Sequence, residues 1–415
     1  MQIDNFPAAD ASQGEHIAKW PTVTYTELGS KRIRLVRLIP GPPGSIIGCE
    51  VGMCFLEQSP SYTAVSYTWG SPLGFRDILV GSQPHSVPKN LWRFLDQARK
   101  LPGSDRLAGW LWIDALSIDQ SDPQEKLNQV GIISSIFRNA EHVIVWLGPS
   151  YMDSDYALAT MYPDSTTGPI KYSKTLAGPV WPALYSLCER PYWRRLWVYQ
   201  ELKSALRTEL MCGSRLVPLR NFRRYLSDPV APRLQDKFEL LRKSSAGMTF
   251  RLLRLPPKMS LWSLLASTSH LRCVDPRDKA YAVLSIADTG EQGIQADYTI
   301  PVPVLLNRIL VNEHNIKAPE SLHQVGKQCM DLERWFDEPS NSIFVTKGPV
   351  KSDRHINLLE QLASEREPVY PELTVLFHEW ADFYSHKCIS RLLLRRSEDM
   401  EIIGKHGDSP DRPAK

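Results

Sequence analysis

The chain has 415 residues, of which 42% are hydrophobic and 23% charged, and its formal net charge at pH 7 is only +3. This length predicts two or three domains, and so small a net charge argues against nucleic acid as a partner. No apolar run reaches the roughly 18 residues of a membrane span, and the N-terminus does not resemble a signal peptide. The seven cysteines are dispersed without metal-ligand spacing, so we expect reduced thiols, no metal site and a cytoplasmic protein.

The first part of the chain predicts three strands. We expect residues 1–20, which are polar, to be disordered. Charged and apolar side chains alternate from Lys31 to Leu38, as in a half-exposed strand, and a second strand is expected from Ile46 to Leu56. A third strand, Tyr62 to Tyr67, runs into the glycine- and proline-containing loop Thr68–Pro72, which forces an irregular turn at the strand's carboxyl end.

The stretch from Leu111 to Pro149 predicts a strand, a loop, a helix and a second strand. The apolar residues Leu111–Ile113 suit a strand buried on both faces and end on a carboxylate, Asp114. The second strand is the apolar run Val143–Leu147. Two strands joined by a crossover helix are expected to be parallel, which places Asp114 and the loop Ser117–Ser121 at the edge where ligands usually bind.

The helix between these strands has its own start signal. Asp122 is a capping residue, Pro123 stands in the first turn, and Glu125 follows three residues after the cap. Asp114 itself has two interpretations: it faces a ligand, or it caps the nearby helix and holds the loop.

A further helix is predicted from Trp193 to about Leu206. Trp193, Trp197 and Glu201 are spaced by four residues and would lie on one helix face. The simpler interpretation of Glu201 is a surface ion pair whose partner is Arg194, Arg195 or Lys203. The tryptophans, including Trp69 and Trp112, have a simpler role as packing residues.

Beyond residue 220 the pattern is mainly helical. The charged segment Arg272–Tyr281 predicts a turn that is held together by Arg–Asp pairs, ends one helix and begins another. We divide the chain into a first domain at 21–220, a helical region packed on it at 221–330, a helical C-terminal region at 331–403 and a disordered tail at 404–415.

Three stretches in order resemble the fungal heterokaryon incompatibility (HET) domain, a distant relative of the TIR domain. They are YTAVSYTWG (62–70), LWIDALSIDQ (111–120) with its helix and VIVWLG strand, and RPYWRRLWVYQE (190–201). The resemblance covers roughly residues 20–310 and includes a later block, RCVDPRDKAYAVL (272–284). The chain departs from the family pattern at Ser117 and Asp119, where cysteine and asparagine are common, so a thiol role at this point is not expected.

The resemblance implies an α/β fold: a TIR-like, mostly parallel sheet flanked by helices, with extra N-terminal strands and a mainly helical C-terminal region. It implies that Glu201 is the catalytic carboxylate of NAD cleavage, with no required cofactor and with NAD as the candidate substrate. A carboxylate near the ribose can stabilise an oxocarbenium-like state. The nucleotide pocket would be shaped by the following residues: Trp69, Gly70, Asp114, Ser117, Asp119, Gln120 and Trp197.

The function implied is that of an effector in fungal non-self recognition and programmed cell death. One mechanism is an NAD glycohydrolase that is switched on by self-association. The alternative is a non-enzymatic adaptor that self-associates or binds other cell-death signalling proteins, and a third is a degenerate family member without activity. Release of nicotinamide from NAD by the purified protein distinguishes the first mechanism from the others.

Overall fold

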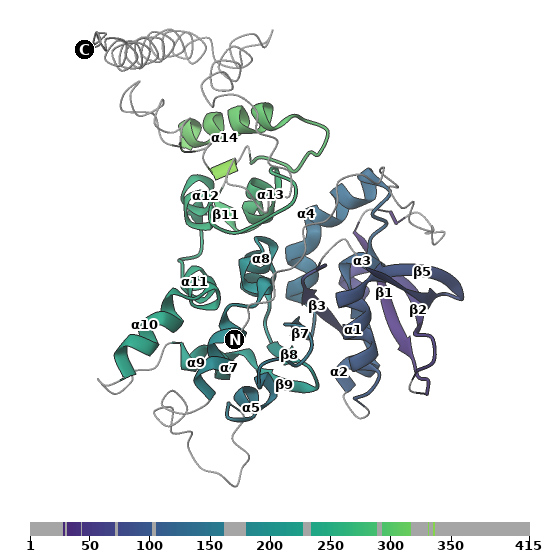
Figure 1. Cartoon of the computed structure of the whole chain (residues 1–415). Helices are drawn as coiled ribbons and strands as arrows, with labels where there is room; N and C mark the ends of the chain where they lie inside the picture. The colour runs from purple at the N-terminus through teal and green to yellow at the C-terminus, as the bar shows by residue number, and fades with distance from the viewer. Residues whose placement is uncertain are drawn as a thin grey trace, which may run out of the picture.

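A computed structural model describes residues 28–29, 31–42, 44–70, 74–101, 105–161, 180–226, 234–288, 293–316, 331 and 335–336. Within these residues a mixed sheet has the strand order β5-β4-β2-β1-β6-β3-β7-β8-β9, with helices on both faces (Figure 1). This arrangement confirms the predicted α/β class. The strands of the sheet are β1 (Arg32–Ile39), β2 (Gly48–Phe55), β3 (Tyr62–Tyr67), β4 (Phe75–Val80), β5 (Gln83–Pro88), β6 (Trp110–Trp112), β7 (His142–Trp146), β8 (Thr208–Cys212) and β9 (Arg215–Pro218).

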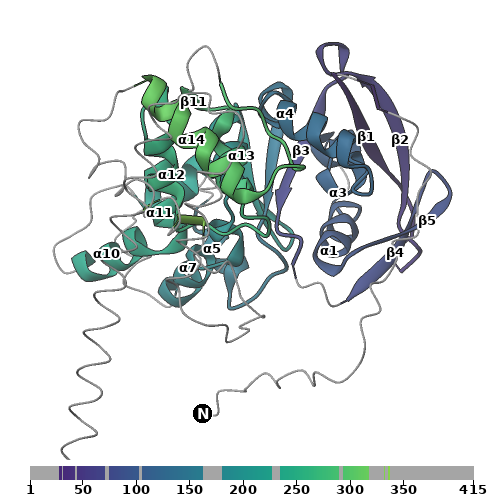
Figure 2. The ribbon, with the colours of Figure 1, turned by 90° about the horizontal axis from the view of Figure 1, so that it is seen from above.

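Helices fill the rest of the described chain. Viewed from above, α10 to α14 gather on the side away from β2, β4 and β5 (Figure 2). None of the helices in the described ranges is long and apolar enough to cross a membrane. The helical elements and the short β10–β11 pair are η1 (Leu56–Gln58), α1 (Lys89–Ala98), α2 (Asp105–Ala108), α3 (Asp114–Ser117), α4 (Pro123–Asn139), α5 (Ser154–Ala159), α7 (Val180–Cys188), η2 (Pro191–Arg194), α8 (Trp197–Ser204), α9 (Leu219–Tyr225), α10 (Gln235–Lys243), α11 (Ser245–Leu252), β10 (Met259–Ser260), α12 (Leu261–Thr268), α13 (Asp278–Leu284), β11 (Ala287–Asp288) and α14 (Val302–Ile316).

The centre of the sheet is parallel. Strand β3 pairs in parallel with β6 on one side and with β7 on the other, so that Ala64 lies opposite both Trp112 and Val143. Helix α4 carries the chain from β6 to β7, and β3 lies between those two strands. The predicted crossover into a parallel strand is therefore confirmed, and the carboxyl ends of three strands meet at one edge.

Side chains of β3 alternate between the two faces of the sheet, as the pleat of a strand requires. Tyr62 and Ala64 belong to the core that includes residues of α4. Val65 and Tyr67 belong to the core that includes residues of α1. Ser66, which shares the face of Tyr62 and Ala64, is therefore directed towards the side of α4 rather than α1.

Helix α4 begins where the sequence predicted. The side chain of Asp122 accepts hydrogen bonds from the backbone N–H groups of Gln124 (2.9 Å) and Glu125 (3.2 Å). Glu125, however, turns away from the cap and pairs with Arg34 of β1 through two bonds of 2.5 and 2.7 Å. Because Arg34 is 1% exposed, the expectation that Lys31–Leu38 is half-exposed is wrong at this position. A carboxylate partner from α4 makes the burial of the guanidinium tolerable.

The extra N-terminal strands predicted between residues 31 and 56 are present. Strand β1 pairs antiparallel with β2 and also with β6, which attaches the hairpin to the parallel centre. A second hairpin, β4–β5, extends the sheet from the outer side of β2.

The predicted continuous helix from Trp193 to Leu206 is wrong. The chain forms the 3₁₀ turn η2, becomes extended at Arg195 (φ −77°, ψ 136°), and enters α8 at Trp197. The cause is pairing with a distant segment: Leu196 N–H donates to the Arg272 carbonyl (2.9 Å), and Arg272 N–H donates to the Arg194 carbonyl (2.6 Å). Trp193 therefore does not share a helix face with Trp197, and the two rings pack in different cores.

The segment Arg272–Tyr281 forms the turn with an Arg–Asp pair that the sequence predicted. It follows α12 and leads into α13, and Arg277 pairs with Asp275 (2.7 Å). Arg277 also donates to the carbonyls of Tyr298 (2.5 Å) and Ile300 (3.1 Å). The tail predicted at 404–415, the N-terminal 1–20 and nearly all of 331–403 lie outside the described residues.

Candidate functional site

A polar cluster lies at the carboxyl edge of the parallel strands, where ligands bind in open α/β sheets. Trp69, in the loop after β3, donates from its indole N–H to Asp114 Oδ2 (2.8 Å), just beyond β6. The other oxygen of Asp114 accepts the backbone N–H of Ala115 (2.7 Å) at the start of α3. The two loops are thus joined at this edge. The carboxylate of Asp114 holds its loop, which was one interpretation, and it also lies at the edge of the sheet where ligands usually bind.

Glu201 approaches the same edge from α8 and is 6% exposed. Its Oε2 accepts a hydrogen bond from the hydroxyl of Ser66 on β3. That hydroxyl also lies 2.7 Å from the hydroxyl of Tyr192 in η2. All three motifs noted in the sequence therefore contribute residues to one cluster.

Burial raises the pKa of the Glu201 carboxyl because the charged form loses its hydration. The positive charge of Arg195 and the hydrogen bond from Ser66 oppose this rise, and the negative charge of Asp114 adds to it. A buried carboxyl with a raised pKa, close to a second carboxylate and an arginine, has the character of an acid–base or electrostatic group. It is not the surface ion pair that the simpler interpretation describes.

The three cations considered as partners of Glu201 are engaged elsewhere. Arg194 pairs with Glu189 (2.8 Å), and Lys203 donates to the carbonyls of Leu253 and Leu255. Arg195 donates to the backbone carbonyl of Tyr67, at the end of β3. It therefore acts on Glu201 through its charge, from a position fixed by the strand.

Tyr67 lies fully buried at the end of β3. Its pKa is raised well above the usual value by burial and then by the nearby charge of Asp114. Its hydroxyl makes no hydrogen bond of good geometry in the described part of the chain. Tyr67 thus adds a buried polar group to the cluster, on the face of the sheet opposite Ser66.

Three residues predicted to shape the pocket instead build the loop after β6. Ser117 is fully buried, and its hydroxyl accepts the Ile113 N–H (3.1 Å). Asp119 accepts the backbone N–H and the hydroxyl of Ser121. Gln120 is exposed and donates to the Asp114 carbonyl (3.2 Å). They hold the loop that carries Asp114 and make no hydrogen bond to Glu201.

Two further predicted pocket residues have distinct surroundings. Trp197 donates from its indole N–H to Asp278 Oδ2 (3.1 Å) and so faces the helical region. Gly70 has φ +85°, a conformation that side-chain-bearing residues rarely adopt, and therefore shapes the turn after Trp69.

Sequence reasoning did not select Ser66, Tyr192 or Asn90. Asn90, in the first turn of α1, donates to the Thr68 carbonyl (2.6 Å) and accepts from the Trp146 indole (3.1 Å). A serine at a buried position of a strand was a signal for Ser66. For the other two residues, the sequence carried no comparable sign.

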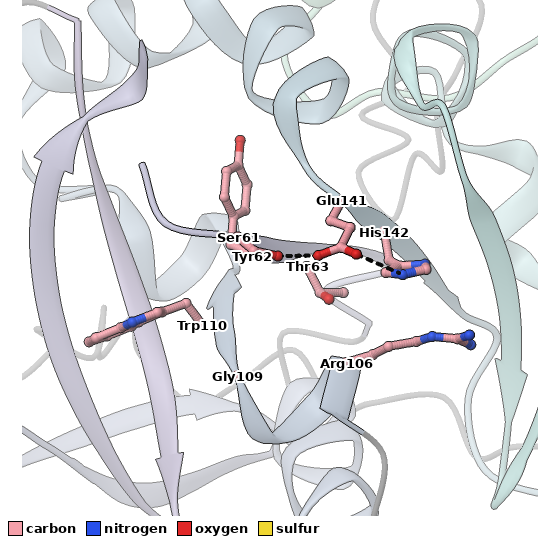
Figure 3. Close-up of a pocket in the computed structure, with 8 residues that line it drawn as sticks. All are labelled: Ser61, Tyr62, Thr63, Arg106, Gly109, Trp110, Glu141 and His142. Carbon is pink, nitrogen blue, oxygen red and sulfur yellow. Dashed lines mark hydrogen bonds and ion pairs between the residues drawn. The ribbon is translucent and has the colours of Figure 1, made fainter. Parts of the chain in front are cut away.

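A hollow of about 220 Å³ lies at the opposite edge of the sheet (Figure 3). Within it, Glu141 accepts a hydrogen bond from Ser61 and lies 3.8 Å from His142 Nε2. These residues stand at the amino ends of β3 and β7, so the hollow is separate from the cluster around Glu201. No group of three or more potential metal ligands occurs among the residues that the structure describes.

Comparison with known proteins agrees with the arrangement of the motifs. Residues 62–201 match the family model "Heterokaryon incompatibility protein (HET)". The match begins at Tyr62, a core residue of β3, and ends at Glu201. The chain is similar to "Heterokaryon incompatibility protein 6, OR allele" of Neurospora crassa, with 26% identity over 333 residues. The match covers 64% of this chain and 49% of the relative, so the chain spans about half the length of that protein. No solved structure matches.

Proposed function

Because this chain carries a heterokaryon incompatibility (HET) domain at residues 62–201, we propose that it is an effector of non-self recognition and cell death that acts in the cytoplasm. The Neurospora crassa relative, whose printed name is that of a heterokaryon incompatibility protein, supports this role. We propose further that the domain cleaves NAD with Glu201 as the catalytic carboxylate, as the resemblance to TIR domains implies.

The observation that carries the enzymatic proposal is the placement of Glu201. It lies against Ser66 of β3, in the same cluster as Asp114. Ser66 precedes Trp69, in the turn that follows β3, by three residues. A structural ion pair does not need a buried position at the carboxyl edge of a parallel sheet, whereas a ligand site is found there.

The chemistry requires one bond to break and one to form. The bond between the nicotinamide nitrogen and C1′ of the ribose breaks, and its electron pair goes to the ring nitrogen, giving neutral nicotinamide. Water then adds to C1′ and loses a proton, giving ADP-ribose. An ionised Glu201 would stabilise the positive charge that develops on the sugar, and Arg195 and Ser66 favour that ionised form against the effect of burial.

The test is the release of nicotinamide from NAD by the purified full chain. We expect Glu201→Gln to lower kcat by about 100-fold or more, which is the usual scale for an electrostatic catalytic group. The matched control is Glu141→Gln, because Glu141 lies at the opposite edge of the same strands. Equal turnover by the wild type and Glu201→Gln would refute the assignment of Glu201.

A second function is favoured by one specific observation. Glu201 is almost completely buried and joined to Ser66, so it also cross-links α8 to β3 as a purely structural group would. In this case the domain is a non-enzymatic adaptor that acts through self-association. It would assemble normally in light scattering and release no nicotinamide at any protein concentration, and Glu201→Gln would weaken folding and assembly together.

A further inference from the structure

Three arginines lie in the short segment that leads to α8, and only two of them have strong partners. Arg194 pairs with Glu189 and also donates to the Ser245 hydroxyl (3.0 Å). Arg195 donates to the Tyr67 carbonyl. Arg190 makes only a long contact with the Tyr151 carbonyl (3.5 Å) and forms no ion pair with a residue in the described ranges. Its Nε is buried and has no hydrogen-bond partner there.

A buried guanidinium N–H without an acceptor is costly, so the position of Arg190 calls for an anionic partner. Asp155 does not supply this partner. Arg190 and Asp155 both lie near enough to Cys212 to act on the pKa of its thiol, yet they form no ion pair with each other in the described structure. The guanidinium is planar and offers paired donors, which suits bidentate contact with phosphate oxygens.

Arg190 lies beside the backbone that follows β7. A Cβ added to Gly148 would lie 3.8 Å from Arg190 Nη1, and Gly148 has φ +104°. The peptide there thus approaches the guanidinium without a side chain between them. Farther along this loop, Met152 (φ 50°) and Asp153 (φ 55°) are held in a left-handed conformation that costs energy for residues other than glycine.

Tyr151 provides an aromatic face beside the same cation. Its ring centroid lies 5.7 Å from Arg190 Cζ, and the residue is 63% exposed. A ring that is held on a cation and open to solvent can stack with the base of a nucleotide.

We propose that Arg190 binds the diphosphate of an adenine nucleotide and that Tyr151 stacks with its base. This inference rests on the proposed function and names how that substrate is held. The register supports the order of the parts: Ser66 lies opposite Val145, and Gly148 follows three residues later. At 3.3 Å per residue, Gly148 lies at most about 10 Å along the chain direction from the level of Ser66, the partner of Glu201. The reacting sugar is then placed near Glu201, and the phosphates and adenosine extend towards Arg190.

Calorimetric titration of the full chain with ADP and with adenosine tests the site without turnover. We expect Arg190→Gln to weaken ADP binding at least tenfold and to leave adenosine binding unchanged, whereas Tyr151→Ala weakens both. The control is Arg194→Gln, which removes an arginine of the same segment that is committed to Glu189. Circular dichroism and urea unfolding confirm that each variant is folded.

ADP binding that is absent in the wild type, or equal in Arg190→Gln, would overturn the inference. If NAD turns over, Arg190→Gln should raise KM for NAD and leave KM for nicotinamide riboside, which lacks the diphosphate, unchanged. A normal KM for NAD in this variant would refute the anion site and leave the assignment of Glu201 intact. ADP binding through Arg190 without any NAD turnover would refute the catalytic proposal alone.

Discussion

Breaking the buried pair between Arg34 of β1 and Glu125 of α4 should be among the most destabilising single changes in the part of the chain that the structure describes. Their side chains are 1% and 4% exposed, and two bonds of 2.5 and 2.7 Å join them. Glu125 Oε1 also accepts the backbone N–H of Asp119 (2.6 Å), and Arg34 donates to the Ser117 carbonyl (3.2 Å). Replacing Glu125 with alanine therefore removes the carboxylate partner of a buried guanidinium and the acceptor of a loop N–H.

Removal of one partner of a buried ion pair costs about 3–5 kcal/mol. We expect Glu125→Ala and Arg34→Met each to lower the free energy of unfolding by about this amount. At roughly 2–4 °C per kcal/mol for a domain of about 150–250 residues, Tm should fall by about 6–20 °C. The double variant Arg34→Met/Glu125→Leu should recover most of the loss, because no unpaired charge remains in the core.

Urea unfolding followed by tryptophan fluorescence, carried out on the wild type and on each variant, measures both effects. The control is Glu50→Gln, which breaks the pair between Arg37 of β1 and Glu50 of β2. The side chains of that pair are 45% and 50% exposed, so the variant should cost no more than about 1 kcal/mol. Similar small losses for Glu125→Ala and Glu50→Gln would refute the reasoning from burial.

Two further predictions concern the carboxyl edge of the sheet. The pKa of Glu201 is raised in the folded state, so folding favours the protonated form, and the free energy of unfolding of the wild type should fall relative to Glu201→Gln as pH rises above about 4.5. Urea unfolding of both proteins between pH 4 and pH 8 measures the difference, and a difference that does not vary with pH would contradict the cause given for the shift. Gly148→Ala should lower the free energy of unfolding by about 1–2 kcal/mol, because alanine is strained at φ +104°; Gly131→Ala, in helix α4 with no atom within 4 Å of the added Cβ, should instead stabilise the protein.

Features set by local spacing or by strand direction could be predicted from the sequence. The Asp122 cap depends on residues within one helical turn, and it is present. The meeting of Trp69 with Asp114 follows from parallel strands, whose carboxyl ends lie at one edge. The arrival of Glu201 at that edge was inferred from the family resemblance, and its geometry agrees with that inference.

Features set by contacts distant in sequence could not be predicted. Nothing near Glu125 indicates that its partner is Arg34, which precedes it by 91 residues. Trp193 and Trp197 have the spacing of residues on one helix face, but backbone pairing of the intervening segment with Arg272 interrupts the helix. Ser117 and Asp119 carried the right polarity for a ligand loop, yet their hydrogen bonds are used within the loop itself.

The backbone pairing of Arg272 with the segment before α8 links the helical layer to the chemistry of the sheet. The same two hydrogen bonds that interrupt the helix also fix Arg195, and the indole of Trp197 is held by Asp278 at the start of α13. Arg195, whose charge opposes the rise in the pKa of Glu201, therefore lies between a backbone pairing with the helical layer and a side-chain hydrogen bond to β3. The helical layer and the sheet are in this way joined at the residues that surround the buried carboxyl of Glu201.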